Sequence, residues 1–529
     1  MESKGWGVKM VKYLENNNSG FATWNANKNK TKKSGGFLWW FVVFMLSWWA
    51  LGVMFGKNQN VVATDINQEA VVDISNVPVQ EISSEKITAK VQGLRISDID
   101  LRDFRANSKS DDTVKLLAEP DDFAEIGIVG IGTTAPTADT VWKVDGDTYT
   151  WRNADGVVFN RSVIIDNYVI TINDQIVNNT KKDFSFAPYA KIRRGNDRVS
   201  SAGVYTGLVV YVNGDVDHDD WRALAKKPRA YTTTNGFAGF ADQYWETIAD
   251  IDAPDQTIRA QKYGDLYQSE ISTRAINVAA NETANITSYL YAGPRDSSAL
   301  SVAEKQINGI KGTIDYGWFW FLAMPMLWLI NTINALVMNY GVAIIIMTIL
   351  LRMLLWPLTR KSYTSMAAMQ KMQPEMQRIQ KLYGNDKQRL QIEMMKLYQT
   401  HKTSPMSGCL PMLIQIPIFF ALYKALIISV QMRNAHFLWI SDLAVMDPYF
   451  ILPILMGATM WLQQRLQSAA TKSADKNDVA AQTQRAMRWM PLIFTVMFAW
   501  MPAGLVLYWT MSNVFGIVQM YIIKRNMEK

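Results

Sequence analysis

Residues 341–358 read Gly-Val-Ala-Ile-Ile-Ile-Met-Thr-Ile-Leu-Leu-Arg-Met-Leu-Leu-Trp-Pro-Leu, with Arg352 as the one charged residue. About 20 apolar residues cross the hydrocarbon of a bilayer, so this stretch predicts a transmembrane helix. At ~1.5 Å per residue, Arg352 lies ~16 Å from one end of the stretch and ~9 Å from the other. A guanidinium does not lose its proton there, so holding it costs roughly a few kcal/mol or more. We therefore expect Arg352 to be functional; the alternative is that it snorkels to the nearer interface.

The rest of the chain divides into a polar part and an apolar part. Of its 529 residues 49% are hydrophobic, but residues 56–315 are polar and mixed while 316–523 are largely apolar. This division predicts a membrane protein with one large soluble domain. The net charge of +7 then marks cytoplasmic loops rather than nucleic-acid binding. One cysteine, three scattered histidines and no nucleotide-binding or nucleophile motif predict a protein without metal, cofactor or enzymatic activity.

The first predicted span covers residues 36–55 and follows a group of four lysines within 28–33. This charge predicts an uncleaved signal anchor with a cytoplasmic N-terminus, and a cleaved signal peptide is the alternative. Residues 1–35 are polar and rich in Asn and Lys, so we expect a disordered cytoplasmic extension.

Five further spans are predicted from apolar stretches at 341–358, 410–430, 449–465, 488–503 and 504–523. The connections between them alternate in charge: 360–408 is rich in Lys and Arg, whereas 431–448 holds only Arg433. The positive-inside rule then gives six spans in a bacterial inner membrane, with both termini cytoplasmic and a short basic tail at 524–529. Residues 316–340 are uncharged and long enough to span, but a span there would turn the basic 360–408 connection outward. We expect an interfacial helix on the periplasmic side instead.

Two soluble parts follow from residue periodicity. Within 56–315, short β-favouring segments alternate with turn residues, which predicts a periplasmic all-β sandwich. The acidic group Asp215, Asp217, Asp219 and Asp220 beside His218 is expected to be a solvated loop rather than a calcium site.

Within 360–408, an apolar stripe interrupted at Gly384-Asn385 predicts a cytoplasmic antiparallel helical hairpin. The stripe consists of Met369, Met372, Met376, Ile379, Tyr383, Leu390, Met394 and Leu397.

Several strings in the membrane region match one family in order. They are 316–321 (Tyr-Gly-Trp-Phe-Trp-Phe), 352–359 (Arg-Met-Leu-Leu-Trp-Pro-Leu-Thr), 373–375 (Gln-Pro-Glu), 413–423 (Leu-Ile-Gln-Ile-Pro-Ile-Phe-Phe-Ala-Leu-Tyr), 447–457 (Asp-Pro-Tyr-Phe-Ile-Leu-Pro-Ile-Leu-Met-Gly), 502–508 (Pro-Ala-Gly-Leu-Val-Leu-Tyr) and Ser512-Asn513. The soluble part adds looser matches at 93–101, 236–245 and 291–296. The chain resembles the YidC-type membrane protein insertases (YidC/Oxa/Alb family), in the Gram-negative form with a large periplasmic domain.

The resemblance implies a polytopic α-helical membrane protein with six transmembrane helices, a periplasmic β-supersandwich domain and a cytoplasmic helical hairpin. It implies an insertase and chaperone whose core, 341–523, encloses a hydrophilic groove open to cytosol and lipid. Arg352 would attract acidic residues in the tail of an inserting protein. The implied partners are nascent integral membrane proteins, the Sec translocon, membrane lipids and, weakly because of the short tail, the ribosome. The core is expected to be monomeric.

Six further polar or aromatic residues are candidates for lining this groove. Thr348 lies four residues before Arg352 and hence on the same helix face. Gln415 lies in the next span, and Tyr508, Trp509, Ser512 and Asn513 lie in the last one. For Thr348, Ser512 and Asn513 the alternative is a hydrogen bond between helices, and for Tyr508 and Trp509 it is plain packing. Lys424 departs from the family pattern, and we expect it to snorkel outward.

Two other functional classes remain open from sequence. A secondary transporter would use Arg352 to bind an anionic solute, but such proteins usually carry repeated halves and broken helices. No such repeat is visible in this sequence. An envelope enzyme acting through the β domain would need a catalytic constellation, and the sequence offers none.

Overall fold

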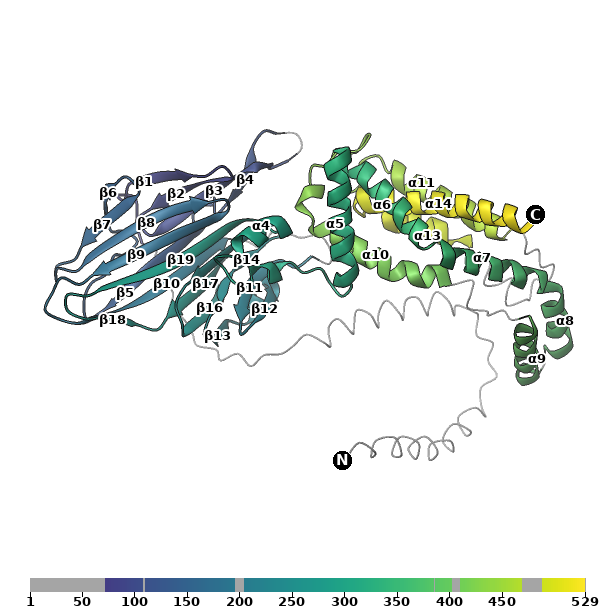
Figure 1. The fold of residues 1–529 in the computed structure, drawn as a ribbon, viewed down its shortest axis with the longest axis horizontal. Coiled ribbons are helices and arrows are strands. Elements are labelled where there is room, and N and C mark those ends of the chain that lie inside the picture. Colours follow the sequence, from purple (N-terminus) through teal and green to yellow (C-terminus); the bar gives the residue numbers. More distant parts are fainter. Residues whose placement is uncertain are drawn as a thin grey trace, which may run out of the picture. The chain divides into compact units, whose positions relative to one another are not determined.

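The computed structural model describes residues 72–107, 110–195, 204–384, 386–401, 410–468 and 488–528 (Figure 1). The predicted N-terminal extension, the signal anchor at 36–55 and Cys409 lie outside the described residues.

The β domain consists of two antiparallel sheets that pack face to face (Figure 1). The ten-stranded sheet has the order β1-β2-β3-β5-β10-β17-β16-β13, with β4 on β3 and β18 on β10. Its strands are β1 (Val79–Ser83), β2 (Ile87–Gln92), β3 (Arg95–Arg105), β4 (Thr113–Leu116), β5 (Phe123–Ile131), β10 (Phe184–Gly195), β13 (Arg229–Thr233), β16 (Gln256–Tyr263), β17 (Leu266–Thr273) and β18 (Ile276–Val278).

The nine-stranded sheet has the order β12-β11-β14-β15-β19-β9-β8-β7-β6. Its strands are β6 (Lys143–Asp145), β7 (Thr148–Arg152), β8 (Val158–Asp166), β9 (Val169–Val177), β11 (Gly207–Val212), β12 (Asp215–Asp220), β14 (Phe237–Ala241), β15 (Trp245–Ile251) and β19 (Thr283–Pro294). Contacts of β15 with β10 and of β14 with β17 join the two sheets. Every residue of β15 is buried, so this strand lies at the centre of the domain.

Alternating burial explains why these segments form strands. In β2, Ile87, Ala89 and Val91 are buried and the residues between them are more exposed, as expected for a strand with one face on the core. The β-rich character predicted from sequence is confirmed.

The prediction of a solvated acidic loop at 215–220 is wrong. These residues form strand β12, which pairs with β11 along its whole length. Asp219 forms an ion pair with Arg229 (Nε–Oδ2 2.5 Å), and Asp220 caps helix α3 (Trp221–Lys226) through the amide of Ala223. Asp219 and Asp220 are therefore positioned by partners within the fold. Strand propensity alone does not predict β12, because Asp is depleted in strands.

A row of alternating charges crosses the ten-stranded sheet. Strand register places Arg95, Glu125, Lys191, Glu270 and Arg259 opposite one another on five successive strands. Glu125 is buried at its centre, with Arg95 Nε at 2.8 Å and Lys191 Nζ at 3.1 Å from its carboxylate. Burial raises the pKa of Glu125, but Lys191 and Arg95 outweigh it and hold the pKa below its ordinary value. The carboxylate therefore stays ionised inside the domain.

Asp250 on β15 has the opposite environment. Its side chain is buried, one carboxylate oxygen has no hydrogen-bond partner among the described residues, and burial raises its pKa to about 7. Removing a carboxylate from water disfavours its ionised form. Among the described residues, no Lys or Arg forms an ion pair with Asp250 to offset this effect.

The β domain should therefore be more stable at pH 5 than at pH 8. The folded state keeps the Asp250 proton up to about pH 7, whereas an unfolded chain loses it from its ordinary value of 3.8, so stability falls as pH rises between these values. This linkage corresponds to roughly 2–4 kcal/mol. Asp250→Asn should reduce the difference in unfolding temperature between pH 5 and 8, measured from the β-sheet circular dichroism. The exposed Asp255→Asn is the control, and an equal reduction in both variants would contradict the assignment.

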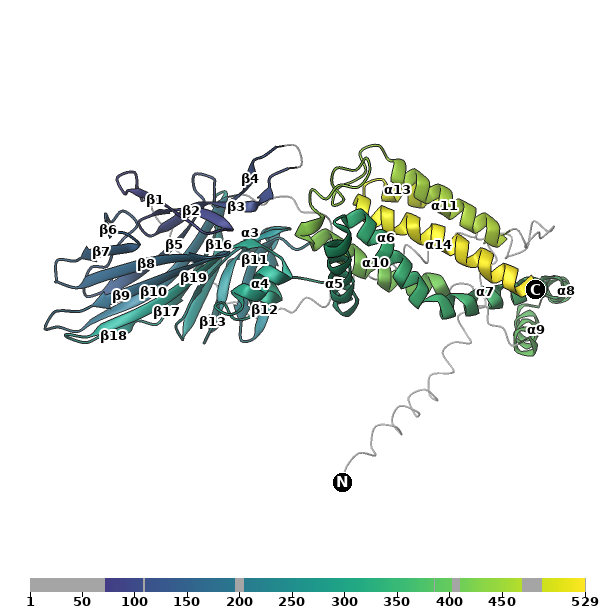
Figure 2. The ribbon, with the colours of Figure 1, turned by 45° about the horizontal axis from the view of Figure 1, so that its top comes forward.

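The C-terminal part is helical, and its helices pack around one apolar core (Figure 2). Ile330, Ile344, Leu422, Met456 and Leu505, from five different helices, are buried there. The helices are α5 (Trp320–Val337), α6 (Tyr340–Leu354), α7 (Trp356–Lys371), α8 (Gln373–Tyr383), α9 (Lys387–Thr400), α10 (Leu410–Ile428), α11 (Ile451–Ser468), α13 (Met490–Phe498) and α14 (Ala503–Glu528). The short elements α4 (Ser297–Ala303) and η1 (Ile310–Thr313) precede them, and η3 (Val430–Met432) follows α10.

By length and composition, two described helices can cross a membrane, within 320–337 and 503–526. The bent pair α6 and α7 counts as a third if it is one span. The sequence predicts an unbroken helix over 341–358, but α6 ends at Leu354 and α7 departs from it by 62°. Pro357 explains the break, because its ring lacks an N–H and clashes with the carbonyl of Met353. At the other end, α14 continues through the predicted tail to Glu528.

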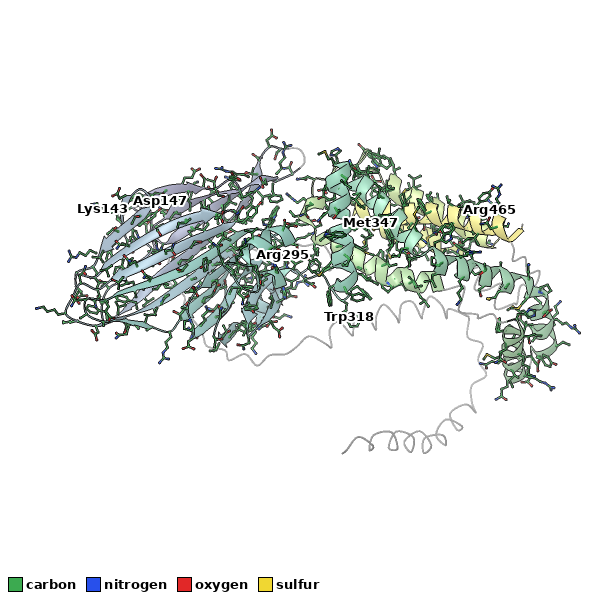
Figure 3. All side chains as sticks on the ribbon, in the orientation of Figure 1. Lys143, Asp147, Arg295, Trp318, Met347 and Arg465 are labelled. Carbon is green, nitrogen blue, oxygen red and sulfur yellow. The ribbon has the colours of Figure 1, made fainter. Side chains whose placement is uncertain are left out.

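Helix α5, predicted as interfacial, contacts α6 and α10 through one face. Its buried stripe is Ala323, Met326, Ile330 and Ile333. The remaining surface exposes large apolar side chains such as Trp320 and Trp328, and the exposed Trp318 directly precedes the helix (Figure 3). An apolar helix surface of this kind requires lipid or protein against it.

In the basic connection, α8 and α9 pack against each other after α7. Helix α8 ends at Tyr383, α9 begins at Lys387, and Pro374 lies in the first turn of α8. All residues of the predicted apolar stripe are buried or half-buried. The stripe thus holds the two arms together, while Leu382, Ile392 and Met395 stay exposed.

Candidate functional site

Arg352, in the last turn of α6, reaches across to α14. Its Nε donates to Ser512 Oγ at 3.0 Å, and its Nη2 donates to the same oxygen. The side-chain amide of Gln519 donates to the backbone carbonyl of Arg352 at 3.0 Å. Both Ser512 and Gln519 are buried. Arg352 is therefore attached to α14 by its side chain and by its backbone.

A second polar contact lies one turn earlier on α14. The amide of Gln415 on α10 donates to the Tyr508 hydroxyl at 2.6 Å, and Tyr508 is buried. Tyr508, Ser512 and Gln519 are four and then seven residues apart, so they share one face of α14. Four of the seven residues predicted to form the site, Arg352, Ser512, Tyr508 and Gln415, thus form two contacts along this face.

Gln519 was missed by the sequence analysis, although its spacing from Ser512 carried the signal. Its Oε1 is buried and has no hydrogen-bond partner among the described residues. A buried acceptor of this kind costs free energy unless water or a ligand satisfies it.

Three predicted site residues have other contacts. Thr348 is fully buried, and its hydroxyl donates to the carbonyl of Ile344 in its own helix at 2.6 Å. Asn513 contacts α11 instead, with Nδ2 3.3 Å from Thr459 Oγ1. Trp509 packs against an aromatic cluster, with its ring centroid 5.1 Å from those of Phe419 and Phe498. Asn513 thus forms the hydrogen bond between helices and Trp509 the packing contact named as their alternatives, whereas Thr348 bonds within its own helix.

Local sequence explains how the surrounding helices are positioned. The buried Asp447 accepts from the amide of Leu452 at 2.7 Å, near the start of α11, and from Trp439 Nε1 at 3.1 Å. The amides of Ala503 and Gly504, at the start of α14, donate to the carbonyls of Val445 and Leu443. The 433–448 connection therefore fixes the starts of α11 and α14. Helix α11 carries Thr459, the partner of Asn513, and α14 carries the polar face that contacts Arg352.

Lys424 does not snorkel outward as expected. It is buried, and its ammonium lies 2.6 Å from the carboxylate of Asp315, in the segment that leads into α5. Burial raises the pKa of Asp315, but Lys424 more than offsets it, so that this pKa is lowered. The pair joins α10 to the segment before α5 and is separate from the Arg352 contacts.

Arg352 differs from Lys424 in its surroundings. Within the described ranges, no carboxylate forms an ion pair with it, and its side-chain contact is the neutral hydroxyl of Ser512. Burying a charge without a counter-charge is costly, so such residues in membrane helices mark functional positions.

Comparison with known proteins identifies the family of the chain. The model of the "60Kd inner membrane protein" family matches residues 332–529, which contain all seven predicted site residues and Gln519. The model of the "YidC periplasmic domain" matches residues 80–329. The chain belongs to the YidC family. Both halves of the chain, the β domain and the helical part, are accounted for by YidC family models.

Individual YidC proteins resemble the chain over most of its length. The membrane protein insertase YidC of Mannheimia succiniciproducens is 35% identical over 509 residues, covering 89% of this chain and 91% of the relative. The insertase of the same name from Magnetococcus marinus is 35% identical over 422 residues, covering 76% of this chain and 74% of the relative. That of Ruegeria sp. is 33% identical over 500 residues, with 82% and 81% covered.

Proposed function

We propose that this protein inserts integral membrane proteins into a bacterial inner membrane and assists their folding, with or without the Sec translocon. The observation that carries the proposal is Arg352, a permanent cation attached to α14 through neutral partners and without a carboxylate among the described residues. Such a cation attracts an acidic segment that must leave water. The names of the relatives, membrane protein insertase YidC, support this activity.

In the proposed mechanism, Arg352, Ser512, Gln519, Tyr508 and Gln415 line a hydrophilic groove. The acidic tail of a nascent protein enters the groove, where Arg352 reduces the cost of removing its carboxylates from water. The apolar segment of the substrate then moves into lipid, and burial of that segment together with the membrane potential drives the step. No nucleotide is needed for this sequence of events.

The proposal includes a topology. The chain has six spans, with α5 lying at the periplasmic interface, the hairpin α8–α9 in the cytoplasm and the β domain, a supersandwich, in the periplasm. Its partners are nascent membrane proteins, the Sec translocon, lipids and weakly the ribosome, and the core is a monomer. The charge alternation of the connections supports this orientation, because a spanning α5 would place the basic hairpin outside.

We expect the chain to replace a bacterial insertase. A strain depleted of its own insertase should resume growth and membrane insertion of small proteins when this chain is the sole replacement. The empty vector is the negative control. Stable membrane expression without recovery of insertion, combined with uptake of an anionic solute into vesicles, would instead favour the transporter hypothesis.

Single cysteines should report the topology. In a Cys409→Ser background, Lys381→Cys in the hairpin should react with a maleimide from the cytoplasm, and Ser441→Cys from the periplasm. Both positions are exposed in the structure, so reactivity reports sidedness rather than burial. Labelling of each cysteine from the opposite side would overturn the six-span assignment.

A further inference from the structure

A cavity of about 290 Å³ lies between α11 and α13, away from the Arg352 contacts. Gly457 and Trp461 of α11 form one wall, and Leu492 and Thr495 of α13, with Pro491, form the other. Arg488 and Trp489, directly before α13, line its end. The proposed insertase mechanism uses none of these residues.

The packing of the two helices explains why the cavity exists. At Gly457 the helices approach so closely that an added Cβ would lie 1.9 Å from Thr495 Oγ1. One turn further along α11, the bulky Trp461 lies on the same face as Gly457. The helices therefore meet at the glycine and leave space between them toward Arg488.

The cavity combines an apolar wall with a positive end. Arg488 forms no ion pair or hydrogen bond with any other described residue, and none of the lining residues is acidic. A second cation lies near the Trp461 wall, because the guanidinium of Arg465 is 5.2 Å from the Trp461 ring centroid. Trp461, Trp489 and Leu492 are 47%, 63% and 56% exposed, so their apolar surfaces need a cover.

We propose that this cavity binds one anionic phospholipid. The phosphate lies at Arg488, with Arg465 as a second cation, and an acyl chain runs along Trp461 and Leu492. A guanidinium beside apolar and aromatic surface matches a lipid, which has its charge at one end and hydrocarbon at the other. A free inorganic anion would leave the apolar wall uncovered, and a purely apolar segment would leave Arg488 without a counter-charge.

The test is lipid retention by the full chain, measured by native mass spectrometry in detergent. Phosphatidylglycerol and phosphatidylcholine with identical acyl chains are titrated in parallel. The wild type should retain one phosphatidylglycerol roughly tenfold more tightly than phosphatidylcholine, and Arg488→Gln should remove most of this preference. Arg525→Gln, which removes an exposed arginine at the end of α14, is the matched control and should keep it. Leu492→Trp, which fills the cavity, should weaken binding of both lipids.

Equal affinity for the two lipids, or equal losses in Arg488→Gln and Arg525→Gln, would overturn the proposal. Elution of each variant as a single species in size-exclusion chromatography shows that the fold is retained. In membranes, a photoreactive residue in place of Trp461 should form an adduct with lipid. An adduct formed mainly with a nascent protein would show that the cavity receives substrate, and would also overturn the lipid assignment.

Discussion

Arg352→Ala should abolish most insertion of substrates with acidic tails, while Arg352→Lys should retain substantial activity. The reason is that lysine keeps the charge and most of the reach, whereas alanine leaves acidic groups without an attracting cation. For acidic tails we expect at least a roughly tenfold loss in the alanine variant, the effect of about 1.4 kcal/mol. Neutralising the tail acids should restore part of the insertion. The measurement compares matched acidic and neutral substrates at equal insertase abundance.

Ser512→Ala separates the charge from the contact that holds it. This variant removes the hydroxyl that accepts from Arg352 but leaves the guanidinium in place. It should therefore insert acidic tails better than Arg352→Ala but less well than the wild type, because the cation is kept and loses the contact that positions it. A purely structural arginine predicts a different pattern, in which lysine and alanine at position 352 fail alike, both tails are affected equally, and protein levels fall in parallel.

Glu125→Gln should destabilise the β domain by roughly 3–5 kcal/mol, because it leaves the buried Lys191 and the nearby Arg95 without their shared carboxylate. The unfolding temperature of the β-sheet signal measures this loss. Adding Lys191→Met to the same chain should recover part of it, since one uncompensated charge is then removed. The control is Asp103→Asn, which breaks the ion pair with Lys86. The Asp103 side chain is 41% exposed and that of Lys86 is 37% exposed. That change should cost at most about 1 kcal/mol.

Insertion by the Glu125→Gln variant should be less affected than its thermal stability. The proposed groove lies in the helical part, and none of its residues contacts the charged row of the β domain. If insertion fell in proportion to unfolding while the helical part stayed intact, the β domain would itself take part in insertion.

Sequence patterns predicted the large features because each has a strong physical signal. Alternating short strands identified the β domain, and the apolar stripe with its break at Gly384 identified the arms of the hairpin. Arg352 stood out because an isolated charge in an apolar stretch is costly. The family strings added Ser512, Tyr508 and Gln415, whose contacts the structure then brought onto one face of α14.

Other features depended on contacts between distant residues, which no local pattern reports. Lys424 was expected at the surface because its partner, Asp315, lies more than a hundred positions earlier in the chain. The aspartates of β12 were predicted to form a solvated loop because no local pattern reports the pairing of Asp219 with Arg229. Thr348 and Asn513 are polar and close in sequence to Arg352 and Ser512, but this spacing does not fix their partners. The Thr348 hydroxyl bonds to its own helix, and the Asn513 amide bonds to α11.

In the proposed mechanism, the double attachment of Arg352 to α14 limits how the site can adapt to substrates of different width. Because Ser512 accepts from the side chain and Gln519 donates to the backbone carbonyl, α6 and α14 form one frame around the cation, which we expect to keep its depth as different substrates pass. Any widening must then come from helices outside this frame, such as α10, which meets α14 through the Gln415–Tyr508 bond and through ring packing against Trp509. A cation at a fixed depth opposite a movable helix would accept apolar segments of many shapes. It would attract the acidic groups of every tail from the same position.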